Sequence, residues 1–108
     1  MTTELDTEYC LGSAETIPVG EGREFDIAGR RIAVFRSRNG RIYATNAACP
    51  HRDGPLADGI LGDSTLICPL HAWKFDLETG ASIHGECGVA IYPAALSPDG
   101  QIVVTIVL

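Results

Sequence analysis

Two short segments, each holding one cysteine and one histidine, constrain this chain more than any other feature. The first reads Cys49-Pro-His51 and the second reads Cys68-Pro-Leu-His71. Thiolate sulfur and imidazole nitrogen are donors that zinc and iron accept in proteins. A site of four such donors needs both segments, so the fold is expected to bring together two loops that residues 52–67 separate in the sequence.

Two kinds of metal centre fit two thiolates and two imidazoles. One is tetrahedral zinc in a Cys₂His₂ site, whose modules usually pair like with like, as C-x₂₋₄-C with H-x₃₋₅-H. The other is a [2Fe–2S] cluster in which one iron keeps two cysteines and the other takes two histidines. Each segment here mixes the two residue types, which favours the cluster. Neutral imidazoles remove negative charge from around the iron and ease the addition of an electron. We therefore interpret the chain as an electron carrier.

Proline and glycine surround these residues in a way that suits rigid loops. Pro50 and Pro69 directly follow the two cysteines. Each proline fixes φ near −65° and removes an amide donor, so the loop turns without flexing. Gly54 and Gly59 are expected to let the backbone pass close to the cluster sulfides, which need N–H donors.

Charge along the 108 residues is uneven and limits the choice of partners. The formal net charge is −6, and residues 53–108 hold Lys74 against a group of acidic residues: Asp53, Asp58, Asp63, Asp76, Glu78, Glu86 and Asp99. No basic stripe suits nucleic acid, and no apolar run approaches the roughly 20 residues of a membrane span. We expect neither nucleic acid nor a membrane as a partner. The acidic residues suit docking on a basic protein surface, and the alternative is that they only keep the protein soluble.

The polar, acidic start of the chain and its cysteine content bear on location. Residues 1–8 do not resemble a signal peptide, and four cysteines without a leader favour a reducing compartment. A cytoplasmic protein is the expectation. Cys10 and Cys87 are expected to be small packed residues, with a place in the wall of the cluster cavity as the alternative for Cys87. His84 is expected to be an exposed loop residue.

Short runs of β-branched and aromatic residues between frequent turn signals predict an all-β domain. The Asn39-Gly40 pair is a strong hairpin signal. No window sustains a helical period, so helix should be limited to one turn around residues 14–17. The predicted strands lie at about residues 25–27, 31–36, 41–45, 60–61, 65–67, 73–77, 89–93 and 101–108.

The runs Cys49-Pro-His51-Arg-Asp-Gly54-Pro55-Leu56 and Cys68-Pro-Leu-His71-Ala-Trp73-Lys-Phe75-Asp-Leu77-Glu-Thr-Gly80 closely resemble the two loops of Rieske [2Fe–2S] proteins. The resemblance extends over residues 9–107. It implies the Rieske fold: antiparallel, sandwich- or barrel-like β-sheets with a cluster-binding loop subdomain at one end. It further implies a single domain, 1–108, in which a subdomain of about 46–84 is inserted into a base formed by 9–45 and 85–108.

The same resemblance implies the ligand set and the redox range. Cys49 and Cys68 would hold one iron, and His51 and His71 the other, with the imidazoles nearest solvent. High-potential members carry an extra disulfide-forming cysteine in each loop and a sulfide-binding serine after the second histidine. This chain has Gly54, Leu70 and Trp73 at those three positions. Fewer hydrogen bonds to the sulfurs predict a potential near the low end of the Rieske range, roughly −150 mV.

Two low-potential groups of this family share the Cys-Pro-Leu-His motif of the second loop with the chain. The run from His71 to Gly80, together with Gly85-Glu-Cys87, favours the small subunit of assimilatory NAD(P)H nitrite reductases. The alternative is the ferredoxin of ring-hydroxylating dioxygenases. In both, the partners are a flavin-containing NAD(P)H reductase or large reductase subunit and a terminal metalloenzyme acceptor. A redox sensor and a zinc-stabilised interaction module are further alternatives.

No substrate turnover site is recognisable in the sequence. An oxygenase needs a second iron held by two histidines and a carboxylate. Once His51 and His71 are used, His84 alone remains, so ligand count excludes oxygenation within this polypeptide.

Overall fold

Three antiparallel sheets make up the part of the chain that the computed structural model describes, residues 6–49, 55–69, 74–82 and 88–107. Their strand orders are β1-β10-β9, β2-β3-β4-β8 and β5-β6-β7. The elements are β1 (Asp6–Ser13), η1 (Ala14–Thr16), β2 (Glu21–Ile27), β3 (Arg30–Arg36), β4 (Ile42–Asn46), η2 (Leu56–Asp58), β5 (Ile60–Leu61), β6 (Thr65–Ile67), β7 (Lys74–Asp76), β8 (Ile91–Tyr92), β9 (Ala94–Leu96) and β10 (Gln101–Val107). The all-β prediction is confirmed. No helix within these ranges is long and apolar enough to cross a bilayer.

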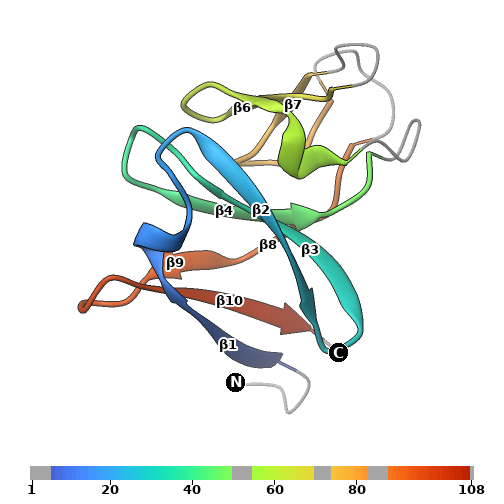
Figure 1. Cartoon of the computed structure of the whole chain (residues 1–108). Coiled ribbons are helices and arrows are strands. Elements are labelled where there is room, and N and C mark those ends of the chain that lie inside the picture. Colours follow the sequence, from blue (N-terminus) through green and yellow to red (C-terminus); the bar gives the residue numbers. More distant parts are fainter. Residues whose placement is uncertain (1–5, 50–54, 70–73, 83–87, 108) are drawn as a thin grey trace.

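The four-stranded sheet is the middle layer of the molecule. Figure 1 shows it between β1-β10-β9 at the bottom and β5-β6-β7 at the top. Its strand β3 is buried on both faces, because all four residues from Ile32 to Phe35 are fully buried. A strand covered on both sides carries a continuous apolar run rather than an alternating one.

One face of the middle sheet packs against the sheet containing β10. Ile32 and Val34 of β3 contact this lower core, to which β10 contributes Ile102, Val104 and Ile106. Alternate residues of β10 supply the contacts, as the two-residue period of a strand requires. The short turn η1 closes this core by burying Ala14, which agrees with the predicted helical turn.

The opposite face of the middle sheet supports the small three-stranded sheet. Ala33 and Phe35 of β3 belong to this upper core, together with Leu61, Leu66 and Phe75 from β5, β6 and β7. Its strands have only two or three residues, below the usual length of about five or six, so the sheet relies on this packing. The middle sheet is therefore the platform on which the smallest sheet rests.

A polar contact also joins the two layers. Ser37, in the β3–β4 hairpin, is 2% exposed and its hydroxyl donates a hydrogen bond to the backbone carbonyl of Asp63 in the β5–β6 turn. The hairpin itself has the predicted Asn-Gly turn, with the Gly40 N–H donating to the Ser37 carbonyl at 3.1 Å. The turn is thus held against the small sheet by a buried hydroxyl that has a partner, as buried polar groups require.

Gly59 lies where the turn η2 passes directly over β6. A methyl group at this position would overlap the carbonyl oxygen of Ile67 and would lie 3.0 Å from Cδ1 of Leu66. The close backbone approach therefore accounts for this glycine. The nearest described neighbours of Gly59 belong to β6 and η2. The expected approach of its backbone to the cluster sulfides therefore stays a prediction.

The substitution Gly59→Ala is expected to lower the free energy of unfolding by about 1–3 kcal/mol, the usual cost of overpacking. Gly62→Ala is the matched control, because its new methyl group would lie 3.6 Å from the Thr65 carbonyl, an ordinary contact. We expect that change to stay within about 0.5 kcal/mol. Urea unfolding of the metal-loaded proteins, followed by circular dichroism, measures both, and equal midpoints would contradict the prediction.

Candidate metal centre

The first cysteine segment leaves the middle sheet at the end of β4. Two backbone hydrogen bonds fix its start, because the Ala47 N–H donates to the Arg31 carbonyl at 3.1 Å and the Leu56 N–H donates to the Ala47 carbonyl at 2.9 Å. A bridge between Ala48 and Pro55 then closes the base of the loop. Cys49 is the next residue and is fully buried.

The second cysteine segment leaves the small sheet at the end of β6. Ile67 pairs with Ile60 on one side and with Lys74 on the other, so strands on both sides fix the base of this loop. Cys68 follows directly and is 2% exposed. Each cysteine therefore lies directly after a residue whose backbone is paired, Ala48 in an isolated bridge and Ile67 in β6.

The fold brings the two cysteines into one apolar cluster. Cys49 and Cys68 both belong to the upper core, with Leu56, Phe75 and Val89 among its other members. A thiolate in such surroundings is costly unless a positive charge balances it. A metal ion bound to both sulfurs supplies that charge. The donor set and its burial therefore fit one iron of a [2Fe–2S] cluster.

A third segment returns beside the first loop. The Val89 N–H donates to the Gly80 carbonyl at 2.7 Å, and the Asp76 N–H donates to the Ala81 carbonyl at 2.9 Å. Gly80 has a φ of +81°, and a methyl group on Gly88 would lie only 2.5 Å from the Gly80 oxygen. These two glycines let the chain leave at Ala81 and return at Gly88 with backbones in contact. This contact places Val89 in the upper core, which also contains both cysteines.

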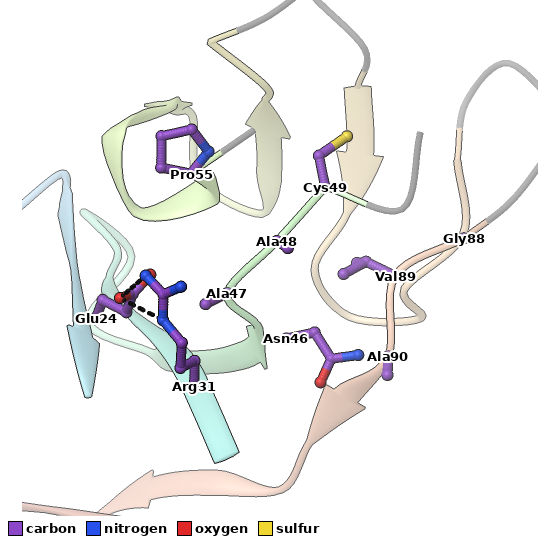
Figure 2. Close-up of a pocket in the computed structure, with 10 residues that line it drawn as sticks. All are labelled: Glu24, Arg31, Asn46, Ala47, Ala48, Cys49, Pro55, Gly88, Val89 and Ala90. Carbon is purple, nitrogen blue, oxygen red and sulfur yellow. Dashed lines mark hydrogen bonds and ion pairs between the residues drawn. The ribbon is translucent and has the colours of Figure 1, made fainter. Parts of the chain in front are cut away.

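A cavity of about 550 Å³ lies beside Cys49 (Figure 2). It is lined by Glu24, Arg31, Asn46, Ala47, Ala48, Cys49, Pro55, Gly88, Val89 and Ala90. Arg31 donates from Nε and Nη2 to Oε2 of Glu24, at 3.0 and 2.5 Å. The arginine side chain is 73% exposed, so this pair contributes less than about 1 kcal/mol to stability. In Figure 2 the sulfur of Cys49 points away from the Glu24–Arg31 pair.

The remaining residues of the predicted site lie partly outside the described residues. Those outside are Pro50, His51, Gly54, Leu70, His71, Trp73, His84 and Cys87. Phe75 is buried beneath the loops, as expected. The expectation for Cys10 is wrong, because it is exposed on β1, with its sulfur 3.8 Å from Oε1 of Gln101. Its side chain lies on the face of β1 opposite to Tyr9 and Leu11, which pack against the lower core.

Two residues of the site were not found from the sequence. Leu56 and Val89 pack in the same cluster as the cysteines, although neither was singled out. For Leu56, the signal was its place directly after Pro55 in a loop of small and polar residues. For Val89, nothing local pointed to the site, because its position depends on the contact between Gly80 and Gly88.

Solved structures with this fold include small redox proteins. A protein assigned as the small subunit of an NADH-dependent nitrite reductase from Mycobacterium tuberculosis matches with a TM-score of 0.89 and 23% identity, over 97% of this chain and 99% of that one. The ferredoxin of carbazole 1,9a-dioxygenase from Nocardioides aromaticivorans matches with a TM-score of 0.78 and 26% identity, over 91% of this chain and 96% of that one.

Larger proteins contain a related segment. The oxygenase component of a probable 3-ketosteroid-9-alpha-monooxygenase from Rhodococcus rhodochrous is 31% identical over 90 residues, which cover 83% of this chain and 21% of that protein. The chain thus spans about a fifth of the length of this relative. The family model that describes the Rieske [2Fe–2S] domain matches residues 7–94. The chain therefore belongs to the Rieske [2Fe–2S] domain family, whose cofactor is a Rieske-type [2Fe–2S] cluster.

Proposed function

We propose that this Rieske electron-transfer domain is a one-electron carrier in which Cys49 and Cys68 hold one iron, and His51 and His71 hold the other. The observation that carries the proposal is the burial of both cysteines in the upper core, each directly after a residue whose backbone is paired. The bound cluster accepts and releases one electron. The chain's own contribution is to hold the sulfur donors rigidly and to keep water from them, so that little has to rearrange.

The more specific role that we propose is that of the small subunit of an NAD(P)H-dependent nitrite reductase. The support is the sequence of the second loop and its continuation, from His71 through Trp73 to Gly80. The electron donor would be a flavin-containing NAD(P)H reductase or large subunit, and the acceptor a terminal metalloenzyme. Because the proposed electron transfer needs NAD(P)H, we propose a cytoplasmic location for the protein.

A ferredoxin of a ring-hydroxylating dioxygenase is the second candidate. It is favoured by the 26% identity to the carbazole dioxygenase ferredoxin, over 91% of this chain. Both candidates are carriers that pass electrons to another protein. The cofactor of the family is an iron–sulfur cluster, which argues against the zinc-stabilised module.

The ligand assignment predicts which substitutions abolish the cluster. Cys49→Ser, His51→Ala, Cys68→Ser and His71→Ala should each remove the visible absorption and the electron paramagnetic resonance signal of the reduced protein. Cys10→Ser is the matched control, because this thiol is exposed on β1 and is no member of the buried cluster. An unchanged spectrum for either histidine variant would show that the ligand set is different.

The reduction potential is expected to lie near −150 mV, roughly the low end of the Rieske range. The physical reason is that Gly54 and Leu70 cannot form a disulfide between the loops, and Trp73 offers no hydroxyl to a sulfide. A redox titration followed by visible circular dichroism measures the potential. A value well above zero would contradict the low-potential assignment.

The proposed role is tested by reconstitution. Adding the cluster-loaded protein to a sirohaem- and flavin-containing large subunit should raise NADH-dependent nitrite consumption, whereas the Cys68→Ser variant should not. The parallel assay uses an aromatic-ring dioxygenase and its flavin reductase. Activity in the second assay alone would replace nitrite reduction by the ferredoxin role.

A further inference from the structure

The cavity beside Cys49 connects this part of the site with solvent. Figure 2 shows the Glu24–Arg31 pair on one side of the cavity and Ala48, Cys49 and Val89 on the other. The Arg31 side chain is 73% exposed, so the charged side is open to water. A cavity of about 550 Å³ with charged groups in its wall has both the room and the hydrogen-bond partners that water needs. Water therefore has access to the wall next to Cys49.

Val89 belongs both to the wall of this cavity and to the upper core. It lines the cavity, yet it is only 7% exposed and packs in the cluster that contains Cys49 and Cys68. Its neighbours Gly88 and Ala90 also line the cavity, but the first has no side chain and the second only a methyl group. Figure 2 shows the Val89 side chain directed toward the segment that carries Cys49. Val89 is therefore the side chain with which the third segment closes this wall.

Hydrogen bonds on both sides of Val89 hold it in this position. Its own N–H donates to the Gly80 carbonyl at 2.7 Å, and the carbonyl of the next residue, Ala90, accepts from the Asn46 N–H at 3.0 Å. The Tyr92 hydroxyl donates a further bond to Oδ1 of Asn46 at 2.6 Å. Valine is branched at Cβ, which restricts its χ1 angle. Because both the backbone and the side chain are restrained, we expect the wall to stay closed.

The medium around the sulfur donors affects the reduction potential. Reduction adds one negative charge to the site, and an apolar environment opposes that charge, whereas water stabilises it. Solvent exposure is accordingly one of the factors that set the potential of an iron–sulfur protein. A side chain that separates a water-accessible cavity from Cys49 and Cys68 therefore lowers the potential.

We propose that Val89 is a barrier residue, which keeps the water of the cavity from the sulfur donors and thereby holds the reduction potential low. The proposal rests on the ligand assignment made above. The residues that predict a low potential from the sequence all lie in the two cysteine loops, whereas Val89 acts from a third segment of the chain.

Val89→Ala tests the barrier, and Val104→Ala is the matched control. Val104 is likewise buried, but it lies in the lower core and does not line the cavity. A redox titration of the cluster-loaded proteins should show that Val89→Ala increases the equilibrium constant for one-electron reduction by about threefold or more, and Val104→Ala by less than about 1.5-fold. A threefold change corresponds to about 28 mV, since a tenfold change is roughly 59 mV for one electron.

Pulsed electron paramagnetic resonance of the reduced proteins in D₂O shows whether water causes the shift. The deuterium modulation should be deeper in Val89→Ala than in the wild type. Val89→Ile should keep both wild-type values, because the cavity has room for one more carbon atom. Equal potentials of Val89→Ala and Val104→Ala would overturn the proposal, and so would a shift in potential without deeper modulation.

A variant of nearly unchanged volume serves if Val89→Ala does not retain its cluster. Val89→Thr adds a hydroxyl to the wall and draws water toward the site, so it should raise the potential more than Val104→Thr does. An equal effect of the two threonine variants would contradict the barrier role. A wild-type protein without the signal of a reduced Rieske cluster would instead defeat the ligand assignment.

Discussion

The placement of two cysteine side chains in one apolar core is the constraint on which the rest of this structure depends. Cys49 follows the middle sheet and Cys68 follows the small sheet in the sequence. The two sheets must therefore pack face to face for both side chains to lie in the upper core. Apolar packing alone is non-directional and leaves register open. Register is fixed by backbone pairing at the base of each loop, at Ala48 with Pro55 and at Ile67 with its two neighbours.

This requirement explains why β3 is buried on both faces. Its side chains alternate between the lower core, through Ile32 and Val34, and the upper core, through Ala33 and Phe35. The small sheet is thus stabilised by packing on the middle sheet, which in turn packs on the sheet that contains β10. The hydroxyl of Ser37 adds a directional link between the layers. We expect a site held in this way to change little in shape when an electron arrives.

Local signals allowed much of this to be predicted. The Asn39-Gly40 turn, the run from Ile32 to Phe35 and the short strands around the second cysteine are where the sequence places them. The strand β1 was not predicted, because its pattern is weak and its pairing partner β10 lies at the other end of the sequence. The contact between Gly80 and Gly88 was missed for the same reason, since sequence spacing does not reveal two backbones that touch. The division into a base and a subdomain of about 46–84 stays a prediction.

Burial and electron transfer place opposite demands on such a site. Apolar residues must cover the sulfur donors, because water would solvate the charge and increase the rearrangement that accompanies each transfer. A thick cover, however, would keep a partner at a distance and slow tunnelling. Leu66 and Phe75 pack with the cysteines and cover that side of the site, whereas the family resemblance implies that the imidazoles of His51 and His71 face solvent, so different ligands meet the two demands.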